Sequence, residues 1–489
     1  MVYLCLLTIL LADVGTGPSP APVRTPHHHA GAIPLIAARI AATVAPVQAQ
    51  SLPPLQNPKK PAGDQVPPAE EAASDEDPTD VLVRLRDQVL AHGRGIPNHT
   101  CVETIQRDHY EPNAGRAVKA CDTLLARRKQ TPYFMQLHLD RTDRLRLDVS
   151  LSYEGEIYSW AGAGRFEEGD IVALVPDGAI GTGPFASLLL GVFEARSPRF
   201  VFEGDATREG RRLMEYSFSV PQEESHYRIN AHNGWVIAGY TGTLLVDPLT
   251  AELVRMDVRT EELPQETNLC EVDTTMEYGM VALGGGGYLL PTATHQRFIG
   301  HDGAEAENNI TFASCREFKG EAKLTFEQRQ PANGSAPSRA AATIALPARV
   351  PLTVELTTTI RGDQAAAGDR IEGRLLKAIR DAGQKATLAP EGALVVGRLM
   401  RVETRMSPVQ DLTIALRWET LEVNGIKIPL SLVPNRLIGN PKTERRGGLR
   451  QRGVEIELPL PGESRYGVYH FPGERMESGF RTEWLTGER

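Results

Sequence analysis

The sequence lacks the short motifs that identify common enzyme classes. It has no Gly-x-Ser-x-Gly nucleophile elbow, no glycine-rich phosphate loop in front of a helix and no His-Glu-x-x-His helix. Cys-x-x-Cys pairs are also missing, so no common zinc spacing is present. We therefore single out no catalytic residue and expect no metal and no cofactor. The residues leave open whether the chain is an enzyme, and favour that it is not.

An excess of positive charge is also missing. The net charge is -9, with 24% charged and 41% hydrophobic residues. An acidic protein repels phosphate backbones and anionic lipid surfaces, which argues against a nucleic-acid partner. The 489 residues are enough for more than one domain with its own core.

Long apolar runs are confined to the first 49 residues. The apolar stretch at residues 2–12 is short and has no basic leader, whereas residues 24–49 carry a basic lead with His27, His28 and His29, an apolar run, and then the small-x-small pattern Val47-Gln48-Ala49. No later run of about 18 apolar residues predicts a transmembrane anchor. We expect a misassigned start, a signal peptide within residues 1–49, and a periplasmic or secreted product.

Only five cysteines are present, and four of them follow the leader. An even number in an exported chain favours disulfides, and four cysteines allow three connectivities. The pairing of near neighbours, Cys101 with Cys121 and Cys270 with Cys315, is the preferred prediction. Free buried thiols are the alternative.

Composition divides the rest of the chain into segments. Residues 50–78 are rich in Pro, Ala and acidic residues and predict a disordered linker. Residues 79–327 predict an antiparallel β domain, 328–348 a second linker, 349–475 a C-terminal β domain and 476–489 a tail. The predicted fold class is mainly β with few helices (α+β). It consists of a curved sheet or half-barrel with packed helices, followed by a small β-barrel or sandwich.

Two helices are predicted in the first domain. One begins at an N-cap at Thr79 or Asp80 and ends at Gly93, with an apolar stripe that should pack on a sheet. The other covers residues 184–194 and is apolar almost all round, which predicts burial inside the curved sheet. Separate strands are expected at residues 133–139 and 144–151.

Aromatic residues gather around the second helix and the strands that face it. They are positioned to line an apolar cavity in a half-closed sheet, although ordinary core packing also accounts for them. The cavity candidates are Trp160, Phe166, Phe185, Phe193, Trp235 and Tyr240.

Histidines and carboxylates provide no comparable cluster. His301-Asp302 has the form of a metal phosphohydrolase dyad, but the helices and further ligands that such enzymes need are not predicted around it. Acidic pairs are abundant on the polar faces of the predicted strands, where solvated side chains are expected.

Residues 235–260 (WVIAGYTGTLLVDPLTAELVRMDVRT) carry a strand, a VDPLT turn and a second strand with alternating charges. This pattern, with the initial helix, the strand DRLRLDVS and the helix at residues 184–194, resembles the LolA-like superfamily of outer-membrane lipoprotein carriers. The resemblance implies an incomplete barrel over residues 78–327 that binds acyl chains or a protein partner.

Two further resemblances concern shorter segments. CDTLLARR, EIYSW and residues 215–221 are similar to a group of uncharacterised exported bacterial proteins, which implies no activity. Gly368-Asp369-Arg370 and residues 390–397 resemble the periplasmic β-barrel of conjugal-transfer and type IV secretion proteins.

Together these observations predict a non-enzymatic protein of the periplasm or cell envelope. It would bind an apolar ligand, a lipid, a lipoprotein or an envelope protein in a concave β-sheet. One alternative is a structural or sensory component of an envelope assembly, and a second is a hydrolase with an unrecognised site.

Overall fold

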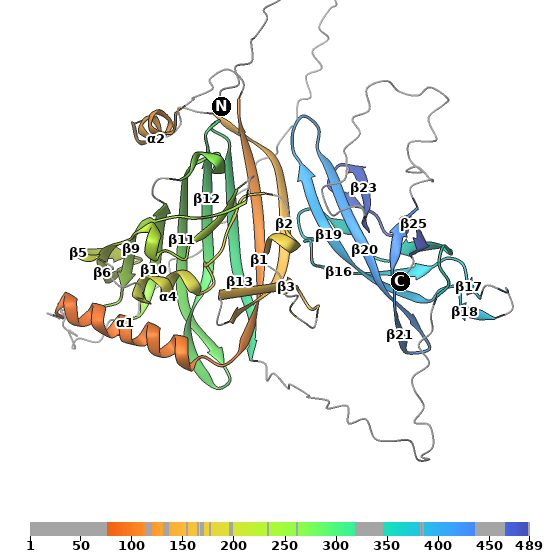
Figure 1. Ribbon diagram of the computed structural model, residues 1–489, viewed down its shortest axis with the longest axis horizontal. Helices are drawn as coiled ribbons and strands as arrows, with labels where there is room; N and C mark the ends of the chain where they lie inside the picture. Colours follow the sequence, from red (N-terminus) through yellow and green to blue (C-terminus); the bar gives the residue numbers. More distant parts are fainter. Residues whose placement is uncertain are drawn as a thin grey trace, which may run out of the picture. The chain divides into compact units, whose positions relative to one another are not determined.

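A computed structural model describes residues 76–487 except 114–119, 131–135, 153–154, 164–165, 167–170, 176–177, 195–198, 232–233, 261–262, 318–345, 382, 384–385 and 436–464 (Figure 1). The structure is mainly β, which confirms the predicted fold class. The expected signal peptide, most of the first linker and nearly all of the second lie outside the described residues. Within the described part of the chain, no helix is both long and apolar enough to cross a bilayer.

The first β-rich segment is one antiparallel sheet whose strand order begins with β3 and ends with β5. Alternating apolar and polar residues place one face of most strands in the core, whereas the edge strand β5 has no buried residue. In spatial order the strands are β3 (Gly155–Trp160), β2 (Leu137–Ser152), β1 (His99–Pro112), β13 (Glu305–Glu317), β12 (Gly286–Gly300), β11 (Leu269–Leu283), β10 (Leu253–Thr260), β9 (Tyr240–Val246), β6 (Arg211–Val220) and β5 (Arg199–Arg208).

Gly242 allows the neighbouring strands of this sheet to approach closely. A Cβ atom at this position would lie 2.2 Å from the Asp257 carbonyl oxygen and 2.5 Å from the Phe218 ring. Only glycine fits between β6 and β10 at this point.

Short elements complete the first segment. A small sheet contains β4 (Ile180–Gly181), β7 (Arg228–Ala231) and β8 (Gly234–Ile237). The helices are α1 (Pro78–Gly95), α2 (Cys121–Gln130), α3 (Ile171–Leu174) and α4 (Ser187–Glu194), with 3-10 turns at Gln222–Glu224 and Gln265–Thr267. Helices α1 and α4 lie side by side against the sheet (Figure 1). Their apolar faces share one core with β6 and β9 to β12.

The N-terminus of α1 differs by a few residues from the predicted one. The N-cap is Asp77 and not Thr79 or Asp80, because Asp77 Oδ1 accepts the Thr79 N–H at 2.7 Å. Pro78 then takes the first helical position, where its missing N–H has no cost. The adjacent Glu76 pairs with Arg84 at 2.9 Å, so the end of the predicted linker takes part in the fold.

Two predictions for the following residues are also corrected. β2 is a single strand from Leu137 to Ser152 where two were expected, because Asp140 to Asp143 stay paired with β1 or β19. Helix α2 was not predicted. Its sequence CDTLLARRKQ has a single buried side chain, Leu124, and therefore no apolar stripe that a pattern could reveal.

The second β-rich segment has its own core, which contains two tryptophans. Trp418 Nε1 and Trp484 Nε1 both donate to Thr482 Oγ1, at 3.2 Å and 2.9 Å, and Thr482 donates to the Val354 carbonyl. Its strands are β14 (Pro351–Leu356), β15 (Ile360–Arg361), β16 (Arg370–Leu375), β17 (Ile379–Arg380), β18 (Thr387–Ala389), β19 (Leu394–Arg405), β20 (Asp411–Val423), β21 (Ile426–Pro429), β22 (Leu432–Pro434), β23 (Gly467–Pro472), β24 (Arg475–Met476) and β25 (Arg481–Thr486).

The predicted tail at residues 476–489 is wrong for most of its length. β25 pairs with both β14 and β22, and Trp484 on β25 is fully buried. The short strand was missed because its apolar residues are few and lie near the chain end.

The two β-rich segments are joined by strand pairing between β2 and β19. Asp143 lies opposite Glu403 in this pairing, and residues Ala72–Arg489 form one compact unit. The proposed domain boundaries remain predictions.

A buried ion pair lies at the β2 end of this junction. Arg107 Nε donates to Asp143 Oδ1 at 2.7 Å, and His109 Nε2 lies 3.3 Å from Asp143 Oδ2. Burial would raise the pKa of Asp143, but the Arg107 charge and hydrogen bonds from His109 and Arg107 outweigh it and lower this pKa to about 2. The ionised pair is therefore retained in the folded protein.

We predict that Asp143→Asn lowers the free energy of unfolding by about 3–5 kcal/mol at neutral pH, because it leaves Arg107 buried without its counter-charge. A carboxyl whose pKa is depressed on folding stabilises the fold above its unfolded pKa. The difference between parent and variant should therefore shrink as the pH falls from about 4 towards 2. Urea unfolding over this pH range measures it. Asp205→Asn, at an exposed ion pair, should cost less than about 1 kcal/mol, and an equal cost at both sites would contradict the prediction.

Candidate functional site

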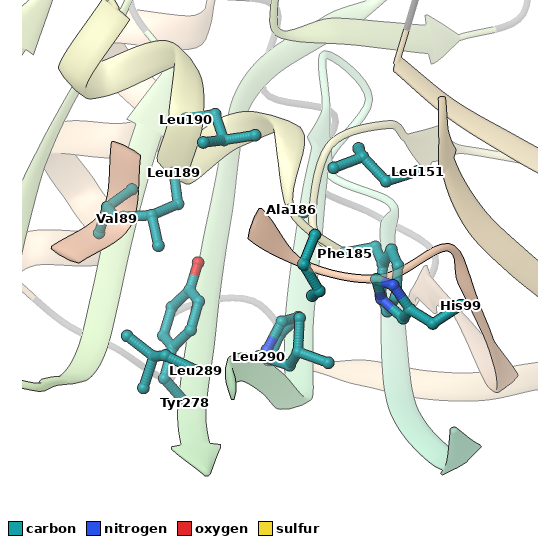
Figure 2. Close-up of a pocket in the computed structure, with 12 residues that line it drawn as sticks. Val89, His99, Leu151, Phe185, Ala186, Leu189, Leu190, Tyr278, Leu289 and Leu290 are labelled. Carbon is teal, nitrogen blue, oxygen red and sulfur yellow. The ribbon is translucent and has the colours of Figure 1, made fainter. Parts of the chain in front are cut away.

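An apolar pocket lies between the two helices and the sheet. It is bounded by the second half of α1, the N-terminal part of α4 and strands β1, β2, β11 and β12 (Figure 2). Its volume is about 40 Å³. The lining residues are Val89, Ile96, His99, Leu151, Phe185, Ala186, Leu189, Leu190, Tyr278, Leu289, Leu290 and Pro291.

Only two of the lining side chains, His99 and Tyr278, contain polar atoms. His99 Nδ1 donates to the Pro97 carbonyl at 3.0 Å, while its buried Nε2 has no partner among the described residues. Burial lowers the pKa of His99, against the opposing effect of the Pro97 hydrogen bond, so the ring is neutral and Nε2 is an acceptor. The pocket therefore offers hydrocarbon walls and one unused hydrogen-bond acceptor.

The turn before α4 inserts the helix into the pocket wall. Gly183 has a φ of 104°, and a Cβ there would lie 2.8 Å from Leu188 Cγ, so the tight entry into the helix requires glycine. Phe185 in this turn packs against His99 and Phe312, with ring centroids 5.5 Å and 5.3 Å apart. The turn thus brings aromatic and aliphatic side chains from one short segment to the pocket.

Glu156 on β3 satisfies the backbone of this buried turn. Its carboxylate accepts N–H groups from Gly183 at 2.8 Å and Ala186 at 3.0 Å, and the Tyr158 hydroxyl at 2.6 Å. Free amides at the start of a helix need such acceptors when water is excluded. Glu156 therefore holds α4 in place next to the pocket.

A second carboxyl, Glu103, is buried nearby on β1. It is 3% exposed, and its Oε2 has no hydrogen-bond partner among the described residues. Burial, and then the negative charge of Glu156, raises the pKa of Glu103 well above its usual range. The same two causes raise the pKa of the pocket residue Tyr278. An anionic ligand group would thus meet an unfavourable field at this end of the site.

The VDPLT turn between β9 and β10 anchors the middle of α1. Arg84 donates to the Pro248 carbonyl at 2.9 Å, and Gln88 donates to the Thr250 carbonyl at 3.0 Å. Asp247 holds the turn itself by accepting the Leu249 and Thr250 N–H groups. Burial opposes the ionised form of Asp247, but hydrogen bonds from Arg211 and from this turn lower its pKa overall.

The six predicted cavity aromatics do not form one site. Phe185 lines the pocket, whereas Phe193 and Tyr240 belong to the core beneath α1 and α4. Trp160 is buried in the core between β1, β2 and α3, and Trp235 packs on it with Arg228 4.8 Å above the indole ring. Phe166 is half-buried outside any strand. Sequence reasoning missed the aliphatic residues Leu289 and Leu290, which follow a glycine-rich hairpin and look like ordinary strand positions.

Both disulfides differ from the preferred pairing of near neighbours. Cys101 is bonded to Cys315, and Cys121 is bonded to Cys270. β1 pairs with β13 near the end of the segment, so the sheet topology brings Cys101 beside Cys315. The free-thiol alternative is excluded by the same bonds.

A larger hollow of about 830 Å³ lies over β5, β6, β9, β10, β11 and β12. Its lining is charged, with Arg255 paired to Asp257, Arg259 to Asp273, and Arg297 to Glu305. The Arg255–Asp257 pair lies within β10, whereas the other two pairs join neighbouring strands, and all three pairs neutralise charge around the hollow. His301 and Asp302 lie elsewhere, in the turn after β12, where Asp302 Oδ1 accepts the Ala304 N–H.

Comparison with known proteins yields only weak structural similarity. No family model and no curated protein matches the chain. Among solved structures, one match is a DUF1329 family protein from Desulfovibrio piger, with 11% sequence identity and a TM-score of 0.22. The match covers 50% of this chain and 92% of that protein. A LolA superfamily protein from Nitrosomonas europaea matches 51% and 97% at 7% identity and the same TM-score.

Superposition at this level carries no functional argument. Neither match supports the resemblance predicted for the C-terminal segment.

We predict that Glu103→Gln stabilises the protein increasingly as the pH rises. A carboxyl whose pKa is raised on folding costs stability above its unfolded pKa, and the neutral amide avoids this cost. Parent and variant should have similar unfolding free energies near pH 4, and the variant should become increasingly the more stable of the two as the pH rises to 8. Urea unfolding at both pH values tests this. Exposed Glu111→Gln on the same strand is the control, and a Glu103→Gln protein that is less stable than the parent at pH 8 would contradict the assignment.

Proposed function

We propose that this protein is a non-enzymatic binding protein that holds an apolar group beneath α1 and α4. The observation that supports the proposal is the pocket wall, in which every lining side chain except His99 and Tyr278 is hydrocarbon. Such walls bind acyl chains or apolar protein side chains through the hydrophobic effect. His99 Nε2 would accept a hydrogen bond from a hydroxyl or amide of the same ligand.

The present pocket is too small to hold an acyl chain. A volume of about 40 Å³ is close to the space of one water molecule, whereas ligand pockets span roughly 300–1,000 Å³. An acyl chain can therefore enter only if one wall moves. Backbone hydrogen bonds between neighbouring strands hold the sheet in place. The helices are therefore the part of the wall that can move.

Helix α1 is the wall with the weaker attachment at the pocket. Its middle is fixed by hydrogen bonds from Arg84 and Gln88 to the VDPLT turn. Beyond Gln88, Val89 and Ile96 contribute apolar contacts to the pocket. Burial of one such side chain stabilises the fold by about 1.5–3 kcal/mol. An apolar ligand that takes the place of this side chain would restore a comparable stabilisation. We infer that α1 swings from the VDPLT turn to admit the ligand.

The two disulfides support a location outside the cytoplasm. Disulfides persist in oxidising compartments and are rare in cytosolic proteins. An apolar cargo also needs a carrier where it crosses an aqueous space. We therefore propose the periplasm or the cell exterior, with a lipid, a lipoprotein or an apolar segment of an envelope protein as the partner.

Binding of a fluorescently labelled long-chain fatty acid methyl ester tests the proposal, because this probe carries no charge that Glu156 or an introduced arginine could repel or attract. Leu289→Arg places a charge on the pocket wall and should weaken binding about tenfold or more, equal to about 1.4 kcal/mol or more. Ile426→Arg introduces the same charge at an exposed apolar residue of the second segment and should leave binding unchanged. Fluorescence titration of the three proteins measures the dissociation constants.

Equal binding by the parent and Leu289→Arg would exclude the pocket as the site. Equal loss in both variants would show that the probe binds the surface nonspecifically. Organic extraction of natively purified protein, followed by mass spectrometry, should independently recover a lipid from the parent and less of it from Leu289→Arg.

A further inference from the structure

Three side chains with metal-binding atoms converge at the end of the β11–β12 pair opposite the pocket. The Sγ atoms of Cys121 and Cys270 and a ring nitrogen of His301 all lie within 4.8 Å of one another. All three residues are half-buried. In the described part of the chain, no other group of three or more His, Cys, Asp or Glu residues meets this distance limit.

Each of the three residues is positioned by a separate backbone feature. Cys121 is the first residue of α2. Cys270 lies at a β-bulge, where the pairing of β11 with β12 shifts between Leu269 and Glu271. His301 is held by its own N–H, which donates to the Asn268 carbonyl at 3.1 Å. Bulges often redirect a side chain towards a functional site, and here the bulge turns Cys270 towards α2.

We propose that reduction of the Cys121–Cys270 disulfide creates a binding site for a soft or borderline transition-metal ion such as Zn²⁺. A dithiol reductant supplies two electrons, the S–S bond breaks, two thiols form, and the reductant becomes a disulfide. The metal ion then displaces the two thiol protons and binds two thiolates and the His301 imidazole. Two thiolates with one imidazole form a donor set that zinc uses when one coordination position remains open.

The surroundings favour thiolates at this place. The N-terminus of α2 stabilises negative charge on the Cys121 sulfur. Leu124, Leu125 and Ile299 pack together with Cys270 and form an apolar floor. The other disulfide differs, because Cys101 is fully buried and, among the described residues, does not belong to a group of metal-binding side chains.

The site would also link redox state to the attachment of α2. The described contacts of this helix with the sheet are the disulfide, the small apolar floor and an ion pair between Arg128 and Glu305 at 2.5 Å. Reduction removes the covalent contact, and a bound metal ion would restore a link between the same two cysteines. Oxidised and metal-bound proteins would thus both keep α2 on the sheet.

Cobalt binding to the full chain tests this inference, because Co²⁺ replaces Zn²⁺ and its thiolate complexes have a sulfur-to-metal charge-transfer band. Protein treated with a phosphine or dithiol, and then freed of the reagent, should bind one equivalent with this band, which Zn²⁺ should remove. Oxidised protein should show no such band. The His27–His29 run can also bind cobalt but contains no sulfur, so it does not contribute to this signal.

Two variants assign the ligands. His301→Ala should weaken Co²⁺ binding about tenfold or more, whereas His295→Ala, at an exposed ion pair on β12, should leave it unchanged. Replacing Cys121 and Cys270 by serine should abolish the band, and replacing Cys101 and Cys315 should preserve it.

Three results would overturn the inference. These are a charge-transfer band that survives His301→Ala at full affinity, a band that depends on Cys101 and Cys315, and loss of native tryptophan fluorescence on reduction without recovery on metal addition. None of these results bears on binding of the fatty acid ester by the oxidised protein, so failure here is distinguishable from failure of the proposed carrier function.

Discussion

The Glu156 carboxylate is the interaction on which the apolar pocket depends. Helix α4 is too apolar to lie at the surface, and a helix buried inside a sheet loses the water that would bind its first amides. Glu156 replaces that water through the Gly183 and Ala186 N–H groups, and thereby fixes Phe185 and Leu189 in the pocket wall. The Glu156 charge also adds to the effect of burial in raising the pKa of the neighbouring Glu103. The pocket wall is therefore apolar, and the acidic side chains Glu103 and Glu156 lie behind it.

Features that depend on local pattern could be predicted from the sequence. The alternation in RLRLDV indicated a sheet with one polar face, and the uninterrupted apolar residues 188–193 indicated a buried helix. Both were confirmed because burial of one face is a local requirement. The N-cap of α1 was misplaced by two or three residues, since Asp77, Thr79 and Asp80 all have capping side chains and only the position of Pro78 distinguishes them.

Features that depend on distant pairing could not be predicted. Cys101 bonds to Cys315 across 214 residues because β1 lies between β2 and β13, and strand order is invisible in a single sequence. For the same reason the cavity aromatics are divided between two cores, with Trp160, Phe185 and Trp235 in one, and Phe193 and Tyr240 in the other. Trp160 looked like a neighbour of α4, but its ring meets Gly368 of the second β-rich segment, where a Cβ would lie 3.0 Å away. Trp160 and α4 are close in the sequence, but the strand order does not bring the Trp160 ring next to this helix.

The β11–β12 pair connects the two sites while keeping them apart. Tyr278 and Leu289 line the pocket near the hairpin, whereas Cys270 and His301 lie at the other end of the same two strands. Eight residues separate Cys270 from Tyr278 along β11, which corresponds to about 26 Å at the usual rise of about 3.3 Å per residue. At that distance Cys121, Cys270 and His301 do not contact a ligand in the apolar pocket. They also do not directly alter the electrostatic potential that Glu156 creates there. Any coupling would have to pass through the strands, and their hydrogen-bonded ladder resists such movement. The two sites are therefore best understood as independent properties of one sheet, an apolar one near its hairpin and a redox-dependent one at its opposite end.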